Sequence, residues 1–243
     1  MPLPKAHALG KNEVSLYVLR HDAVPDTKLR QLRRTLSDHE LQRNQRYANE
    51  RMRRCDLVCR GTLRRLLAGV LQRPPEALEL IEGERGKPLL AAGDLFFNYS
   101  HSGDYAAFAL CWDAQVGVDI ECERPLANPL AIARRQFAKN EYKALTQTPD
   151  ADLQSRFFKY WTLKEAFLKA RGDGISGGMD TFSLEIVSDP PRIDLAFKDG
   201  SAEIAADWAL HSARPIAGYW LALAIHTQGK RYAIVNNPCG SQD

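Results

Sequence analysis

Hydrophobic and polar residues follow two periodicities along this chain. Residues 14–19 (VSLYVL) alternate and are rich in β-forming side chains, which predicts a strand. Ser37 followed by Glu40 has the spacing of a capping box, so a helix is expected to begin there. From about residue 53 to residue 71, leucine and valine recur at helical spacing with arginines on the other face, which predicts an amphipathic helix. The doublet Pro74-Pro75 ends this helix.

Further along the chain, strand-like and helix-like runs are separated by turn signals. A strand, a turn at Ser102-Gly103-Asp104 and a second strand are expected over residues 96–112, and another strand over residues 116–121. Helices are expected at about 129–145 and 152–170. The other predicted strands are shorter or weaker, and they cover residues 78–81, 182–187, 192–197, 219–225 and 232–235.

The order strand, helices, strands therefore occurs twice, and the residues show a faint echo of it. TLRRLLAG at residues 62–69 resembles TLKEAFLKA at residues 162–170, and each follows an acidic helix start by a similar interval. A repeated element order with an echo in the residues favours two halves that are built alike. We therefore predict an α+β protein of two similar halves, residues 1–113 and residues 114–243, joined near residues 113–115.

Composition narrows the class of protein. Of the 243 residues, 44% are apolar and 26% are charged, which is the balance of an ordinary soluble globular protein and excludes disordered, collagen-like and coiled-coil chains. The formal net charge of +3 is too small to indicate a nucleic-acid or membrane partner. Residues 28–73, however, contain 13 Lys and Arg but only four Asp and Glu, and this range is called the basic segment below.

The cysteines and the apolar runs bear on the compartment. The chain has five cysteines and no CxxC pair, so neither a disulfide framework nor a zinc site is indicated, and reduced thiols are the simpler interpretation. The first 13 residues contain no apolar stretch of signal-peptide length, and the most apolar run, residues 218–225, is too short to span a bilayer. We therefore expect a cytoplasmic protein with no membrane partner.

Two pairs of charged residues are candidates for chemistry. In the strand GVDIE, Asp119 and Glu121 lie two apart and share one face, and paired carboxylates suit Mg²⁺ bound together with a substrate phosphate. A solvent-exposed strand with two surface acids fits the same pattern. In the helix WTLKEAFLKA, Glu165 and Lys169 lie four apart and share one face, an arrangement that also fits an ordinary surface ion pair.

Two other segments carry candidate ligands for an anion. Ser100 and His101 in FNYSHS point to opposite faces of an extended chain, so they suit hydrogen bonds to an anion better than a nucleophile–base couple. His101 also fits an ordinary surface histidine. In GERGKP, Gly86 permits close approach of the backbone to a ligand, and Lys87 offers a point charge for phosphate. Together with the basic segment, these residues supply cations for a polyphosphate.

Taken in order, FNYSHS, GVDIE and WTLKEAFLK closely resemble the three signatures of the Sfp-type 4′-phosphopantetheinyl transferases, over roughly residues 36–178. The resemblance implies the fold of that family, a monomer of two α+β halves related by pseudo-twofold symmetry, with the site in the cleft between them. It implies transfer of the phosphopantetheine arm of coenzyme A to a serine of an acyl or peptidyl carrier protein, with release of adenosine 3′,5′-bisphosphate. It also implies a requirement for Mg²⁺, with Mn²⁺ as an alternative.

The same resemblance assigns roles to the acids. By matching position, it implies that Asp119, Glu121 and Glu165 hold the metal and that Lys169 lies beside the transferring phosphate. Phosphoryl-type transfer also needs a base near the incoming serine hydroxyl. Glu165, acting directly or through a metal-bound water, and Glu141 in AKNEY are both candidates for that base.

The coenzyme end is assigned in the same way. The resemblance implies that Ser100 and His101 contact the coenzyme A phosphates, and that Lys87 and Arg54 meet the adenosine and the 3′-phosphate. Cys55, next to Arg54, stands where the family often has a hydroxyl residue. The basic residues of this region do not align unambiguously, so the arginine candidates are Arg43, Arg46 and Arg54.

The carrier partner in this family is an acidic helical protein. Part of the basic segment, or the predicted helix at 129–145 with Arg134, Arg135 and Lys139, is therefore expected to steer it electrostatically. Two other functions fit some of the residues. A nucleic-acid-binding surface would use the basic segment but leaves the acids unexplained. A Mg²⁺-dependent phosphohydrolase would use the same acids with water as the nucleophile.

Overall fold

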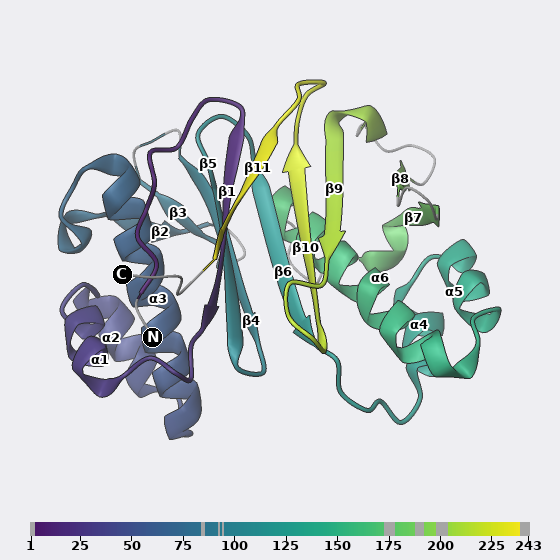
Figure 1. The fold of residues 1–243 in the computed structure, drawn as a ribbon, viewed down its shortest axis with the longest axis horizontal. Helices are drawn as coiled ribbons and strands as arrows, with labels where there is room; N and C mark the ends of the chain where they lie inside the picture. The colour runs from purple at the N-terminus through teal and green to yellow at the C-terminus, as the bar shows by residue number, and fades with distance from the viewer. Residues whose placement is uncertain are drawn as a thin grey trace. The chain divides into compact units, whose positions relative to one another are not determined.

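The computed structural model describes residues 3–83, 86–91, 93, 95–172, 178–187, 192–197 and 204–238. As predicted, the structure is mixed α+β, and it divides into two compact units (Figure 1). The first unit holds the described residues up to 113 together with those from 232 onward. The second unit holds residues 114–231, so the chain passes from one unit to the other between Asp113 and Ala114.

The sheet of the first unit brings together strands from both ends of the described chain. Its order is β11-β1-β5-β4, where β1 is Glu13–Arg20, β4 is Phe96–Ser102, β5 is Tyr105–Cys111 and β11 is Ala233–Pro238. β11 runs parallel to β1, and Figure 1 shows the yellow strand beside the purple one; the other neighbours are antiparallel. The sequence-based division assigned this last strand to the second half, but its backbone pairing with β1 places it in the first unit.

Three helices lie on one side of this sheet (Figure 1). They are α1 (Asp26–Arg33), α2 (Asp38–Gln45) and α3 (Glu50–Leu71), followed by the short 3₁₀-helix η1 (Pro75–Ala77) and a ribbon of β2 (Leu80–Glu82) and β3 (Pro88–Leu90). The helix start predicted at Ser37 is confirmed, because Ser37 and Glu40 form a capping box in which the Ser37 N–H donates to the Glu40 carboxylate at 2.8 Å. α3 buries Leu63, Leu66 and Leu67 of its predicted apolar face, and they belong to the same buried cluster as Phe108 of β5.

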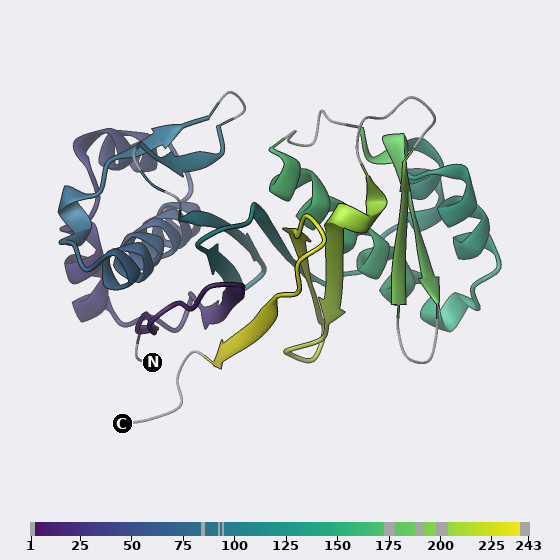
Figure 2. The same ribbon diagram turned by 90° about the horizontal axis from the view of Figure 1, so that it is seen from above.

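The second unit has a three-stranded antiparallel sheet of order β6-β10-β9. Its strands are β6 (Val116–Cys122), β9 (Trp208–Ala213) and β10 (Tyr219–His226), and its helices are α4 (Pro129–Gln136), α5 (Lys139–Thr146) and α6 (Asp150–Arg171). Two short 3₁₀-helices, η3 (Met179–Thr181) and η4 (Ala205–Asp207), flank a separate ribbon of β7 (Phe182–Val187) and β8 (Arg192–Phe197). Figure 2 shows this ribbon beside α5.

The prediction of a single helix over residues 129–145 is wrong in one respect, because the structure has two helices there, α4 and α5. α4 ends at Gln136, and Phe137 adopts an extended backbone with φ −100° and ψ 161°. This turn sends the Phe137 ring into the core of the second unit, where it packs against Phe157 with ring centroids 5.3 Å apart. Burial of one aromatic ring thus outweighs continuation of the helix.

α6 packs directly on β6, and a glycine makes the close approach possible. A Cβ atom on Gly117 would lie 2.1 Å from the carbonyl oxygen of Ala166 and 2.3 Å from the amide nitrogen of Ala170. Only glycine therefore lets the helix backbone come this near to the strand. The contact fixes the height of α6 over β6, and the charged residues of both elements lie beside it.

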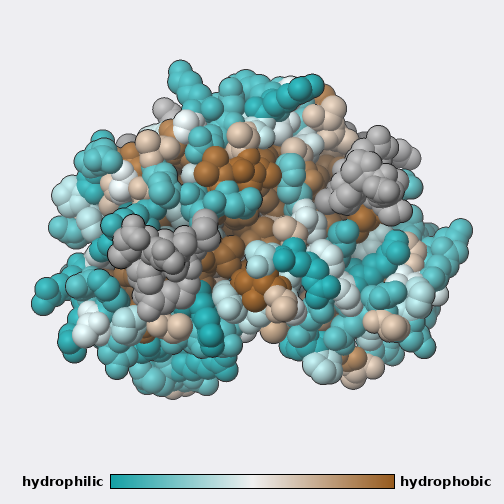
Figure 3. All heavy atoms as spheres, in the orientation of Figure 1, coloured by the Kyte–Doolittle hydropathy of each residue, from teal (hydrophilic) through white to brown (hydrophobic). Residues whose placement is uncertain are grey.

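Each unit has its own cluster of buried apolar residues. On the face drawn in Figure 3, hydrophilic side chains cover most of the surface, with hydrophobic atoms in smaller areas. No helix in the described part of the chain is both long and apolar enough to cross a membrane.

Candidate active site

The two predicted acids of GVDIE lie on β6. Asp119 and Glu121 lie two residues apart on β6, so their side chains are on the same face of the strand. In the neighbouring strand β10, Ala222 lies opposite Asp119 and Trp220 lies opposite Glu121. Asp119 is buried, with 3% of its surface exposed, whereas Glu121 is half-buried and lies 3.7 Å from a guanidinium nitrogen of Arg124. The Asp119 carboxylate therefore lies in surroundings of low dielectric constant, whereas the Glu121 carboxylate reaches solvent.

α6 adds the other two predicted residues, Glu165 and Lys169, to the same site. The Lys169 ammonium donates to Oδ1 of Asp119 at 2.6 Å. Glu165 is 6% exposed, and burial raises the pKa of its carboxyl to about 7. Lys169 lowers that pKa, and the negative charges of Asp119 and Glu121 raise it. The structure thus brings together three carboxylates and one ammonium, and these four residues are called the acid cluster below.

The acid cluster has the donor atoms that a hard divalent cation prefers, because Mg²⁺ binds carboxylate oxygens. Within the described ranges, however, no three Asp, Glu, His or Cys side chains converge closely enough to hold a metal ion. The Lys169 ammonium contacts Asp119 and supplies positive charge beside its carboxylate. The three carboxylates of the cluster therefore fit a divalent cation in charge and atom type.

Glu141 is the predicted candidate that the structure places elsewhere. Its carboxylate is fully buried and accepts hydrogen bonds from the backbone N–H of Ala138 and of Leu184, both at 2.8 Å. The Lys164 ammonium, also fully buried, lies 2.7 Å from it. Such a carboxylate caps α5 and ties it to α6 and β7. That Glu141 serves as the base stays a prediction.

In the first unit, β4 positions the predicted anion ligands. Ser100 is buried and His101 is exposed, as expected for neighbours on an extended strand. In the GERGKP turn, residues 84 and 85 lie outside the described residues, and Gly86 has φ 77°, a conformation that favours glycine. Lys87 is half-buried, and burial lowers the pKa of its ammonium to about 8.

Arg54 on α3 is held by its own unit. Its guanidinium lies 2.7 Å from the Asp26 carboxylate at the start of α1, and it also donates to the carbonyl oxygen of Val24. These contacts fix the side chain against α1. A ligand that uses Arg54 therefore meets a positioned guanidinium whose charge is partly balanced by Asp26.

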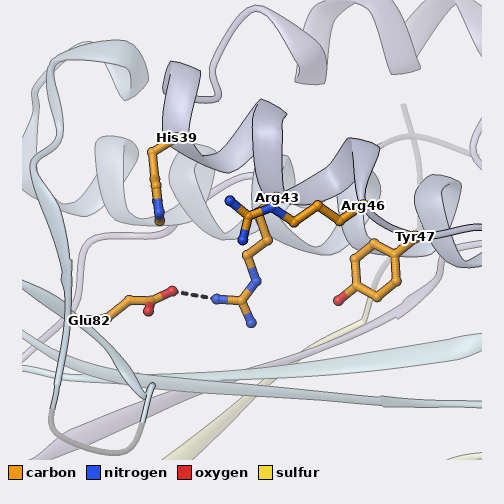
Figure 4. A pocket seen from close by; sticks show the side chains of 5 residues that line it. All are labelled: His39, Arg43, Arg46, Tyr47 and Glu82. Carbon is orange, nitrogen blue, oxygen red and sulfur yellow. Dashed lines mark hydrogen bonds and ion pairs between the residues drawn. The ribbon is translucent and has the colours of Figure 1, made fainter.

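A cation-lined pocket of about 330 Å³ opens in the first unit. Figure 4 shows its side chains, which come from α2, the residues just after it and β2: His39, Arg43, Arg46, Tyr47 and Glu82. Arg43 forms an ion pair with Glu82. Sequence reasoning named the two arginines but missed His39 and Tyr47. The helical spacing of His39, Arg43 and Arg46 is the signal that could have found this face.

Two α+β units, an acid cluster on one and a cation-lined pocket on the other, are typical of an enzyme that acts on a phosphorylated substrate. Comparison with known proteins specifies the class. Residues 25–112 match the model of the 4′-phosphopantetheinyl transferase N-terminal domain, and residues 115–224 match the 4′-phosphopantetheinyl transferase superfamily.

Individual relatives agree with these matches. The chain is 35% identical to the 4′-phosphopantetheinyl transferase HetI of Nostoc sp., over 90% of this chain and 94% of that protein. It is 29% identical to the mouse L-aminoadipate-semialdehyde dehydrogenase-phosphopantetheinyl transferase, over 84% and 71% of the two chains. It is 38% identical to the 4′-phosphopantetheinyl transferase Sfp of Bacillus subtilis, over 44% and 46%. The chain belongs to the 4′-phosphopantetheinyl transferase family.

Proposed function

We propose that this protein transfers the 4′-phosphopantetheine group of coenzyme A to a serine hydroxyl of an apo acyl or peptidyl carrier protein. The products are holo carrier protein and adenosine 3′,5′-bisphosphate. The observation that carries the proposal is the acid cluster, in which Asp119, Glu165 and Lys169 meet where α6 packs on β6. Family membership supports the choice of coenzyme A as donor and of a carrier protein as acceptor.

The acid cluster is proposed as the catalytic group. Asp119, Glu121 and Glu165 would hold Mg²⁺, or Mn²⁺ in its place, and the ion would neutralise charge on the pyrophosphate of coenzyme A. Lys169 would then bind the transferring phosphate in place of Asp119. Glu165 would also accept the proton of the incoming serine hydroxyl, directly or through a metal-bound water.

The first unit is proposed to bind the rest of coenzyme A. Ser100 and His101 on β4 would donate hydrogen bonds to its phosphates. Lys87 and Arg54 would meet the adenosine and 3′-phosphate end. The cation-lined pocket supports this assignment, because it collects positive charge in the same unit.

α4 and α5 are proposed to receive the carrier protein. Arg134, Arg135 and Lys139 are exposed on these helices. Beside Lys139 lies a pocket of about 420 Å³ whose lining includes the rings of Phe137, Phe182 and Phe197. Exposed cations on these helices, together with a pocket partly lined by aromatic residues, suit an acidic helix with apolar side chains. If this surface steers the carrier, KM for the carrier rises with salt; a KM that stays constant between low and physiological ionic strength contradicts it.

The proposal extends to the cellular setting. We propose that the enzyme works as a cytoplasmic monomer, and that its carrier substrates belong to fatty-acid, polyketide or nonribosomal peptide synthesis. The cysteines in the described part of the chain are all free thiols, which suits a reducing compartment.

Release of adenosine 3′,5′-bisphosphate tests the proposed function. Coenzyme A, Mg²⁺ and the protein are incubated with and without apo carrier protein, and the nucleotide is quantified by chromatography. We expect release that depends on the carrier and is lost with EDTA. Release at the same rate without carrier contradicts the proposal, because a phosphohydrolase would behave in that way.

A further inference from the structure

Cys55 and Cys59 have no part in the proposed transfer, yet they lie in a cluster with two histidines. They stand one turn apart on α3, with their Sγ atoms 3.9 Å apart. His21, just after β1, places Nε2 3.6 Å from the Cys55 sulfur and 3.1 Å from the carbonyl oxygen of Gly103. The ring of His101 lies edge-on to that of His21, with centroids 6.4 Å apart.

The cluster provides hydrogen-bond donors to one sulfur. Cys59 is fully buried, and its contact with Cys55, together with burial, raises the pKa of its own thiol, so it keeps its proton and can donate. The S–H of Cys59 lowers the pKa of the Cys55 thiol; burial opposes this effect, and the imidazoles of His101 and His21 add to it. The donors around the Cys55 sulfur therefore favour its thiolate form.

The other charged groups near this turn of α3 are already paired. A guanidinium nitrogen of Arg51 lies 2.8 Å from the Asp104 carboxylate, one of Arg54 lies 2.7 Å from that of Asp26, and one of Arg60 lies 2.7 Å from that of Asp56. The balance that favours the Cys55 thiolate therefore comes mainly from the thiol and imidazole donors. With 8% of its surface exposed, Cys55 lies at the edge of the core, whereas Cys59 is out of reach of solvent.

We propose that Cys55 is a nucleophilic thiolate which a hydroperoxide oxidises to a sulfenic acid. The sulfur attacks one peroxide oxygen, so that an S–O bond forms as the O–O bond breaks. Sulfur loses two electrons, the peroxide gains them, and the departing oxyanion takes a proton from water. Two equivalents of an external thiol reduce the sulfenic acid back to the thiol, and the products are water and the disulfide of the external thiol.

The modification has a consequence that rests on the proposed function. The His101 imidazole acts directly on Cys55, Arg54 precedes Cys55 in the chain, and both are proposed ligands of coenzyme A. An added oxygen at this nearly buried position takes space beside them. We therefore expect oxidation of Cys55 to weaken binding of coenzyme A.

The thiolate is tested first in the wild-type protein, by following alkylation of Cys55 with iodoacetamide, a reaction in which an S–C bond forms and iodide leaves. A thiolate with a low pKa is also a weaker nucleophile, so the alkylation rate of Cys55 at a single pH does not show whether its sulfur is a thiolate. The pH dependence of that rate does. We expect a rate constant that stays within about threefold between pH 5 and pH 8, measured by peptide mass spectrometry. The alkylation rate of glutathione in the same sample should fall about tenfold for each pH unit below the pKa of its thiol. A Cys55 rate that follows glutathione overturns the proposal.

Variants then test the source of the effect. Cys59→Ala removes the S–H donor, so its Cys55 should alkylate at least tenfold more slowly than wild type at pH 5 and equally fast at pH 8. Cys122→Ala, a cysteine of the second unit, is the matched control and should leave the profile unchanged. A Cys59→Ala profile as flat as that of wild type overturns the proposed role of the thiol pair.

Oxidation is tested with hydrogen peroxide and dimedone, which traps sulfenic acids. We expect the adduct on Cys55 and none at that position in Cys55→Ser. Coenzyme A binding, measured by calorimetry, should weaken at least tenfold after peroxide treatment and recover with dithiothreitol, whereas peroxide should not change binding by Cys55→Ser. No adduct on Cys55 overturns the oxidation step, and unchanged binding overturns its consequence. If untreated protein does not bind coenzyme A, the proposed function fails, while the alkylation profile still decides the state of the thiol.

Discussion

The buried pair of Glu141 and Lys164 allows a structural role to be separated sharply from a catalytic one. Both side chains are fully buried, and the carboxylate also accepts two backbone hydrogen bonds. Removing one partner of such a pair leaves the other charge uncompensated, which costs about 3–5 kcal/mol. In a chain of this size, about 2–4 °C of melting temperature is lost per kcal/mol. Glu141→Gln should therefore melt roughly 10 °C below wild type, and more if the backbone bonds also fail.

Calorimetry and kinetics together test this reasoning. Below its melting range, Glu141→Gln should retain a kcat within about twofold of wild type, because the Glu141 carboxylate binds Lys164 and two backbone N–H groups. The double variant Glu141→Gln/Lys164→Met should be less destabilised than the two single changes added together, by about 1–3 kcal/mol, since neither charge is then left alone. A Glu141→Gln protein with wild-type melting temperature and a kcat lowered a hundredfold would refute the structural role and restore Glu141 as a base.

Three further outcomes follow from the charges of the two units. Lys169→Met removes the ammonium that contacts Asp119. The affinity of the free protein for Mn²⁺, measured by electron paramagnetic resonance, should therefore rise, while kcat should fall at least a hundredfold. An unchanged Mn²⁺ affinity contradicts competition between Lys169 and the metal for Asp119. Because the pKa of Glu165 is raised to about 7, protons compete with the metal for this carboxylate as the pH falls below 7. The affinity of the protein for Mn²⁺ should then approach a tenfold loss for each further pH unit. The Glu165→Gln variant should not show this pH dependence. Lys87→Ala should raise KM for coenzyme A about tenfold with little change in kcat, and an equal KM would mean that Lys87 binds nothing on the coenzyme.

Local patterns were sufficient to predict the elements that carry the acid cluster. The alternation in GVDIE and the helical spacing of Glu165 and Lys169 are properties of β6 and α6 themselves. α1 was not predicted, because its start at Pro25 has no side-chain cap and Leu32 is its one buried residue. β9 was missed for a similar reason, since its side chains are mostly partly exposed.

Relations between distant residues were not readable in the same way. β11 pairs with β1 across more than two hundred residues of chain, and no local pattern specifies that partner. The role of Glu141 depends on Lys164 and on the backbone of Leu184, which lies on another element. The contact between Cys55 and His21 likewise joins a helix to the end of a strand. Sequence spacing identified these residue types but not the neighbours that set their chemistry.

Intact-mass spectrometry of an apo carrier protein tests the central proposal most directly. The carrier is incubated with coenzyme A, Mg²⁺ and this protein, with an EDTA sample and the variant Asp119→Asn as controls. We predict a mass gain of one phosphopantetheine group on the carrier, lost with EDTA and reduced at least a hundredfold with Asp119→Asn. No gain on fatty-acid and peptide carriers alike, from protein that is folded and binds coenzyme A, would contradict the account.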